Sequence, residues 1–123
     1  MKSQNTEAML EIVRTICLAL PEAVEHIDGF GHNTFKISGK SFVISGENQQ
    51  GFGLSLKSDR ETQELLLQKE NFFKTPYIGH HGWVSIQNPD RGDWDELTYL
   101  IKEAYLRAAP KRLVKKWNEL HKK

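Results

Sequence analysis

Cysteine is almost absent from this sequence, because Cys17 is the only one among 123 residues. One cysteine cannot form an internal disulfide or a zinc site built from several thiolates, so both features are excluded for this chain. Such sparing use of cysteine is typical of a reducing compartment, and we expect a cytoplasmic protein. Cys17 also falls within an apolar helical pattern, which predicts a buried and unreactive thiol.

Long hydrophobic runs are missing as well. No stretch is apolar for long enough to cross a bilayer as a helix. The first residues show neither the apolar region nor the cleavage pattern of a signal peptide, so we expect none and assign no membrane partner. Length and an ordinary composition, 38% hydrophobic and 27% charged, predict one domain over residues 1–123 with one core.

A large excess of charge of one sign is also missing, because the net charge is only +1, but the charges are unevenly distributed along the chain. Residues 107–123 contain seven basic residues and one acid, whereas the first 106 residues contain ten basic residues and fifteen acids. This polarity favours an anionic partner for the C-terminal end. A solvated helix face is the plainer interpretation of the same run, and strongly basic character, usual in dedicated DNA binders, is absent.

Apolar residues recur with helical spacing in three segments. The pattern predicts a helix over residues 7–20, a long helix that begins at Asp93 and is broken by Pro110, and a last helix over residues 111–121 docked through Trp117. A short helix should also begin at the capping box Ser58-x-x-Glu61 and extend to about residue 69.

Strand-like alternation occupies most of the remaining sequence. We expect strands at residues 24–27, 34–37, 41–45, 54–57 and 84–87, with a tight turn at residues 38–40 and a looser turn at residues 46–51. The connections are too short for parallel crossovers, so the strands should form an antiparallel meander. The sequence therefore predicts an α+β fold, with helices packed on one face of an antiparallel sheet.

The same alternation predicts two different sheet faces. An apolar set should face the helices: Phe35, Ile37, Phe42, Ile44, Leu54, Leu56, Val84 and Ile86. A mostly polar set should face the other way: Thr34, Lys36, Ser41, Val43, Ser45, Ser55, Lys57, Trp83, Ser85 and Gln87. A tryptophan on a face left in water would favour a binding surface. The alternative is that the preceding loop folds over Trp83 and buries it.

Residues 76–84, Pro-Tyr-Ile-Gly-His-His-Gly-Trp-Val, concentrate glycine, histidine and aromatic residues just before a strand. Glycine permits close backbone approach, and Tyr and Trp offer large amphipathic faces, so this composition favours a shaped binding surface. A glycine-bent loop whose aromatic residues only close the core would have the same composition. Both interpretations remain open from the sequence.

Recognised catalytic and metal-binding spacings do not occur. The histidines lack the H-x-x-x-H and H-x-x-E-H patterns, no G-x-S-x-G nucleophile motif is present, and the glycine-rich stretches lack a phosphate-loop lysine. His80 and His81 are adjacent, and in an extended segment they would point to opposite sides. We therefore assign no catalytic residue, no metal ligand and no cofactor.

Six short stretches together resemble the MmcQ/YjbR family of small bacterial proteins. They are CLALPEA at 17–23, FGHNTF at 30–35, GKSF at 39–42, PYIGHHGWV at 76–84, DWDEL at 93–97 and APKRL at 109–113. The resemblance spans about residues 12–113. It implies a CyaY-like, or frataxin-like, fold in a double-wing arrangement that has led such proteins to be labelled DNA-binding. The first helix offers only Glu7 and Glu11 as acids, so the iron-binding ridge of frataxins is not expected.

The leading hypothesis is a non-enzymatic module that binds DNA mainly through phosphate contacts. Its expected contact residues are Lys36, Lys57, Lys111, Arg112, Lys115 and Lys116. The alternative is a small-molecule or peptide site around the 76–83 loop. That site would use His32, Tyr77, His80, His81 and Trp83. A third hypothesis is a sheet face that docks another protein, and the sequence leaves the oligomeric state open.

Overall fold

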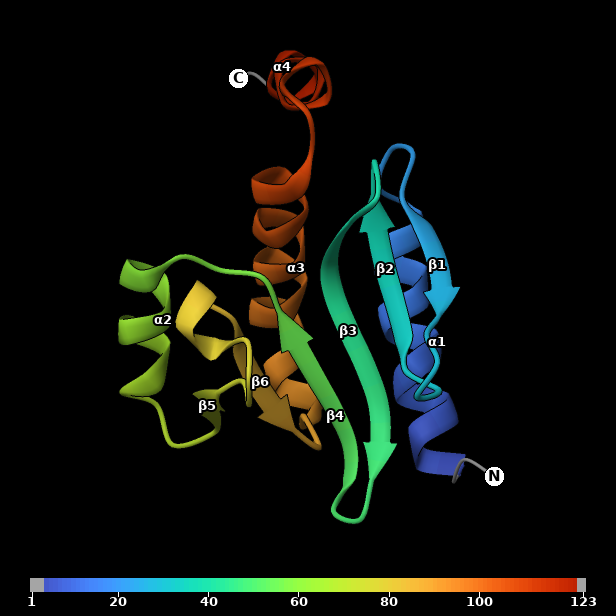
Figure 1. Ribbon diagram of the computed structural model, residues 1–123, viewed down its shortest axis with the longest axis vertical. Coiled ribbons are helices and arrows are strands. Elements are labelled where there is room, and N and C mark those ends of the chain that lie inside the picture. The colour runs from blue at the N-terminus through green and yellow to red at the C-terminus, as the bar shows by residue number, and fades with distance from the viewer. Residues whose placement is uncertain (1–3, 122–123) are drawn as a thin grey trace.

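The computed structural model describes residues 4–121, which form a six-stranded antiparallel sheet with helices against it (Figure 1). The strand order across the sheet is β1-β2-β3-β4-β6-β5. The strands are β1 Val24–Ile27, β2 Asn33–Ile37, β3 Lys40–Asn48, β4 Gly51–Leu56, β5 Phe72–Lys74 and β6 Val84–Gln87. The helices are α1 Gln4–Leu18, α2 Arg60–Leu67, α3 Trp94–Ala108 and α4 Lys111–Leu120, with 3-10 helices η1 Gly79–His81 and η2 Arg91–Asp93.

Two layers make up the body of the molecule. Helices α1 and α3 lie behind the sheet in Figure 1 and cover one of its faces. The opposite face, called the open face below, is turned toward the viewer. The α+β class and the antiparallel sheet are confirmed. Helix α2, however, packs beside strands β5 and β6 at the sheet edge, and α4 projects beyond the end of α3.

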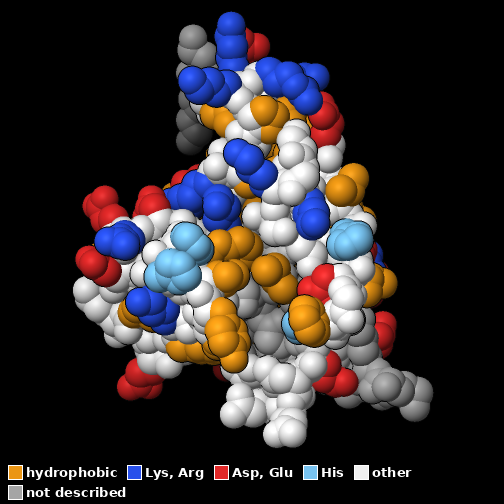
Figure 2. All heavy atoms as spheres, in the orientation of Figure 1, with side chains coloured by type: hydrophobic (Ala, Val, Ile, Leu, Met, Phe, Trp, Pro, Cys, Tyr) orange, Lys and Arg blue, Asp and Glu red, His pale blue; other side chains and the backbone are white. Residues whose placement is uncertain are grey.

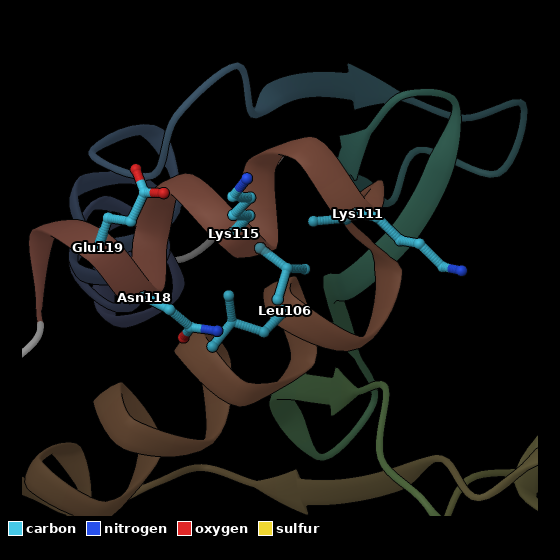
Figure 3. A pocket seen from close by; sticks show the side chains of 7 residues that line it. Leu106, Lys111, Lys115, Asn118 and Glu119 are labelled. Atoms are coloured by element: carbon cyan, nitrogen blue, oxygen red, sulfur yellow. The ribbon is translucent and has the colours of Figure 1, made fainter.

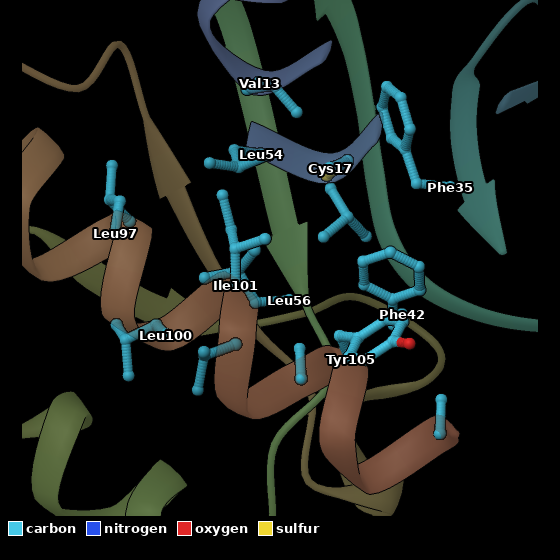
Figure 4. Packing of buried hydrophobic residues seen from close by; sticks show 14 of the residues in the cluster. Val13, Cys17, Phe35, Phe42, Leu54, Leu56, Leu97, Leu100, Ile101 and Tyr105 are labelled. Atoms are coloured by element: carbon cyan, nitrogen blue, oxygen red, sulfur yellow. The ribbon is translucent and has the colours of Figure 1, made fainter. Parts of the chain in front are cut away.

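The core fills the space between the covered sheet face and helices α1 and α3 (Figure 4). Tyr105 of α3 meets Phe42 edge-on, with ring centroids 5.6 Å apart, and its hydroxyl donates a 2.8 Å hydrogen bond to the Pro21 carbonyl. Cys17 is buried as predicted, and burial raises the pKa of its thiol. Five residues predicted for the core are buried together: Phe42, Leu54, Leu56, Val84 and Ile101. Trp94, predicted with them, is only half-buried.

A β-bulge in β3 overturns part of the predicted sheet pattern. Phe35 pairs with Val43 and the next residue, Lys36, pairs with Ser41, so Phe42 is an extra residue on β3. Phe42 and Val43 are both fully buried. From Val43 onward, therefore, the side chains face opposite to the prediction. Val43 and Ser45 lie on the covered face, while Ile44, predicted for the core, lies half-buried on the open face, paired with Ser55.

Two further strand assignments differ from the sequence prediction. The looser turn expected at residues 46–51 is a two-residue connection, because β3 continues to Asn48 and pairs there with Gly51. Residues 72–74, expected only to close the core, form the edge strand β5, whose Phe73 pairs with Ser85 of β6. Alternation therefore buries Phe72 and leaves Phe73 exposed on the open face.

One predicted helix cap is shifted by local hydrogen bonding. The N-cap of α2 is Asp59 rather than Ser58, since the Asp59 carboxylate accepts the N–H of Thr62 at 2.7 Å. Asp93 is the N-cap of α3 as predicted, but its carboxylate closes a capping box with Asp90 on η2 and makes no cap bond to α3. Asp59 also forms a 3.2 Å ion pair with Arg107 of α3. Each aspartate offers a short acceptor to nearby backbone N–H groups.

Of the two interpretations left open for Trp83, burial under the preceding loop is confirmed, because the side chain is 6% exposed. Gln63 of α2 donates to the carbonyls of Gly79 and Trp83 at 2.7 and 2.9 Å, which ties the loop to the helix. Gly82 has φ of +94° and passes so close to the α2 start that a Cβ there would lie 2.8 Å from the Ser58 carbonyl oxygen. The loop is thus held down against α2, and Trp83 is enclosed.

Truncating Ile101 tests the core assignment. Ile101→Ala should lower the free energy of unfolding by about 2–5 kcal/mol, because it leaves a cavity among fully buried side chains. The measurement is a urea melt beside wild type. Lys102→Ala, an exposed neighbour on the same helix, is the control and should stay within about 0.5 kcal/mol. An Ile101→Ala loss as small as the control would contradict the core.

Truncating Trp83 tests the closed loop. Trp83→Ala should lower the free energy of unfolding by about 3–5 kcal/mol, as expected for a buried aromatic side chain. Tyr77→Ala in the same loop should cost under about 0.5 kcal/mol, since Tyr77 is 96% exposed. Denaturant melts of both variants give the comparison, and equal small losses would mean that Trp83 lies in solvent.

Candidate functional site

The open face carries a hollow of about 440 Å³ between two loops, called the sheet groove below. Its floor is formed by Ile44 and Gly46 of β3 and by Gly53 and Ser55 of β4. Gly46 and Gly53 are paired across the two strands, so no side chain rises from the middle of the floor. Figure 2 shows hydrophobic side chains gathered around this hollowed part of the face.

One wall of the groove is the loop that leads from β5 to η1. Thr75, Pro76, Tyr77 and Ile78 line it. The Thr75 hydroxyl lies 2.8 Å from that of Ser85, which in turn lies 2.7 Å from that of Ser55, so a chain of hydroxyl groups joins the wall to the floor. The wall is therefore fixed to the sheet by hydrogen bonds at its base.

Tyr77 stands at the rim of that wall in an unusual conformation. Its side chain is 96% exposed, and its φ is +68°, in the left-handed region that favours glycine. This backbone conformation costs conformational energy for a large aromatic residue, and exposure to water gives no burial in return. Strained positions of this kind concentrate at binding sites.

The opposite wall is the turn between β1 and β2. Asp28 accepts the backbone N–H groups of Phe30 and His32 at 2.8 and 2.9 Å. The bond from the His32 N–H, with that from Phe30, holds the pKa of the Asp28 carboxyl below its usual value. Its other oxygen lies 3.2 Å from Nδ1 of His32, so the carboxylate accepts from that nitrogen and leaves Nε2 for other partners.

Glycine at position 46 is required by the approach of His32. A Cβ on Gly46 would lie only 2.7 Å from Cδ2 of the His32 ring. At the end of the floor, the amides of Asn48 and Gln87 bond to each other across Gly53, with N···O distances of 3.1 and 3.3 Å. The two glycines of the floor are therefore covered by the His32 ring and by this pair of amides.

The structure brings together only two of the five residues predicted for a ligand site. His32 and Tyr77 line opposite walls of the sheet groove. His80 and His81 are exposed on η1, with ring centroids 3.9 Å apart, and do not line the groove. Trp83 is buried. Sequence reasoning missed Asp28, Ile44, Gly46 and Gly53, because the bulge that brings Ile44 and Gly46 to this face leaves no clear signal in the alternation.

The predicted basic residues gather at the other end of the molecule. Lys111, Arg112, Lys115 and Lys116 are all exposed on α4. In Figure 2 basic side chains cluster over the projecting end where Figure 1 places α4. Arg112 is engaged by Glu22 at 2.8 and 2.9 Å, which lowers the pKa of the Glu22 carboxyl and raises that of the guanidinium.

A second hollow lies beneath α4. It measures about 580 Å³ and is lined by Leu106, Ala109, Lys111, Val114, Lys115, Asn118 and Glu119. Figure 3 shows Leu106 of α3 pointing up toward α4, while the Lys111 side chain extends outward from the start of that helix. The inner side of α4 is held by buried Leu113 and half-buried Trp117, whose ring centroid is 6.1 Å from that of Tyr105.

Lys36 and Lys57 belong to the same end of the sheet as α4. Lys36 is the penultimate residue of β2, and Lys57 follows the last residue of β4. Both strands run toward the α4 end in Figure 1, whereas β1 runs away from it toward Asp28. Both lysines are half-buried, so their stems pack on the protein. Lys57 is two residues beyond Ser55 of the groove floor, so the basic surface extends from α4 to the edge of the groove.

Within residues 4–121 there is no cluster of three or more His, Cys, Asp or Glu side chains placed to hold a metal ion. No described helix has the length and apolar character needed to span a membrane.

Comparison with known proteins gives matches of two kinds. No curated protein matches this chain. The crystal structure of Deinococcus radiodurans protein DR2400, described as a DUF419 domain, is similar with a TM-score of 0.66 and 24% identity, over 79% of this chain and 75% of that one. At this identity the likeness shows the fold alone. The YjbR family model matches residues 18–107, well over half of the sequence. The chain therefore belongs to the YjbR family.

Proposed function

We propose that this protein is a non-enzymatic module that binds duplex DNA through the outer side of α4. The observation that carries the proposal is the exposure of Lys111, Lys115 and Lys116 on one short helix anchored by Leu113 and Trp117 on its other side. A helix docked in this way presents its ammonium groups in fixed positions to a phosphate backbone.

The shape of the molecule also supports this surface. Because α4 projects beyond α3, a duplex can approach it without contact with the acidic body of the protein. Lys36 and Lys57 at the adjoining end of the sheet extend the basic surface toward the open face. Phosphate contacts of this kind give affinity with little choice of sequence.

Arg112 has a different part in this proposal. Its guanidinium is already bound by the Glu22 carboxylate through two hydrogen bonds. A phosphate would have to displace that carboxylate, so Arg112 contributes less than a freely solvated lysine. Glu22 therefore limits the positive potential of α4, consistent with a weak, non-specific interaction.

Neutralising the three free lysines tests the proposal. The variant Lys111→Gln/Lys115→Gln/Lys116→Gln should weaken binding to all duplex sequences about equally. The slope of log affinity against log salt should flatten by about one unit per lost contact. The measurement is fluorescence anisotropy with a labelled duplex at several salt concentrations.

The matched control removes the same charge elsewhere. Lys69→Gln/Arg91→Gln/Lys102→Gln changes three other exposed basic residues, none of them on α4. Its affinity should fall less and its salt slope should stay close to wild type. An equal loss of DNA affinity in both triple variants would mean that net charge alone, and not the surface of α4, determines binding, which would contradict the proposal. The proposal would also be overturned if the wild-type protein did not bind duplex DNA at low salt.

A further inference from the structure

We infer that the sheet groove is a binding site for a small aromatic amine, a molecule with a planar ring and a cationic ammonium group. The volume of about 440 Å³ is within the range of small-molecule pockets. This inference does not depend on the DNA-binding proposal, because none of the residues that line the groove belongs to α4.

The walls of the groove favour a flat ligand. Gly46 and Gly53 are neighbours across β3 and β4, but both are covered: the His32 ring stands over Gly46, and the paired amides of Asn48 and Gln87 lie over Gly53. A planar ring therefore fits in the space between the His32 imidazole and the Tyr77 wall, not on the bare strands. The hydroxyl of Ser55 borders this space with a polar group.

The rims provide aromatic surface. Tyr77 lines one wall and is 96% exposed, and the His32 imidazole lines the other. Aromatic side chains stack on planar ligands and attract cations to their ring faces. A ring held between these walls would cover the exposed face of Tyr77.

The charge of the lining selects against anions. Lysine and arginine are absent from the described residues that line the groove, whereas Asp28 and Glu47 are present. Glu47 accepts a hydrogen bond from Thr6 of α1 at 2.7 Å, on the helix side of the sheet. Asp28 is therefore the charged group beside the groove itself, and its carboxylate is the natural partner for an ammonium group.

The experiment uses the full-length ¹⁵N-labelled protein and two probes that share one ring system. Tryptamine carries an ammonium group, and indole-3-propionate carries a carboxylate in its place. Titration with tryptamine should shift the amide signals of Gly46, Gly53 and Ser55 saturably, and tryptamine should bind at least tenfold more tightly than indole-3-propionate. The absence of saturable shifts there, or equal affinity for both probes, would overturn the inference.

Two matched pairs of variants identify the surface that binds. Tyr77→Ala should lower the affinity for tryptamine about tenfold. Tyr99→Ala, which removes another exposed tyrosine, on α3, should leave that affinity unchanged. Gly53→Ala should also weaken binding because its methyl group rises from the floor. That methyl has room, since its nearest neighbours lie 3.5 Å or more away, so the variant should fold. Gly92→Ala, where nothing lies within 4 Å, is its control.

The charge preference has its own variant. Asp28→Asn keeps an oxygen to accept the backbone N–H groups of Phe30 and His32, so the turn should persist. The affinities for the two probes should then approach each other within about threefold. An unchanged preference for tryptamine in Asp28→Asn, or equal losses in Tyr77→Ala and Tyr99→Ala, would show that the groove does not recognise the amine as inferred.

Discussion

The bulge at Phe42 is the constraint on which both faces of the sheet depend. One extra residue in β3 sends Phe42 and Val43 successively into the core, where Phe42 packs against Tyr105. Every later side chain of β3 is then reversed. Without the bulge, Gly46 would face the helices; with it, Gly46 lies beside Gly53 on the open face. The same irregularity that fills the core therefore places Gly46 where the His32 ring can pack against the sheet groove floor.

Opposite ends of the molecule have opposite chemistry as a result of the fold. Strand direction places Lys36 and Lys57 near the basic helix α4, and places Asp28 at the far end beside the groove. A phosphate backbone and a cationic ligand would each find a favourable potential at one end only.

Regular periodicity made much of the fold predictable, and local exceptions made the site unpredictable. The helical stripe through Ile101 and the alternation through Leu54 identified the core, because each depends only on the repeat of its element. The bulge could not be predicted, since Val43 and Ile44 are both apolar and fit either face. The burial of Trp83 was left open for another reason: it depends on the Gln63 bonds that hold the loop down, and these are tertiary contacts. Tyr77 and His32 were identified by composition, but their positions on opposite walls of one groove depend on the tertiary structure.

The orientation of two adjacent residues tests this account most directly. A soluble paramagnetic compound broadens NMR signals of methyl groups that solvent can reach, and it can be applied to Val43 and Ile44 in the folded protein. The bulge predicts strong protection of Val43, which is fully buried, and clear broadening of Ile44 on the open face. Broadening of Val43 with protection of Ile44 would mean that the strand is regular, and would remove both the glycine floor and the groove that rests on it.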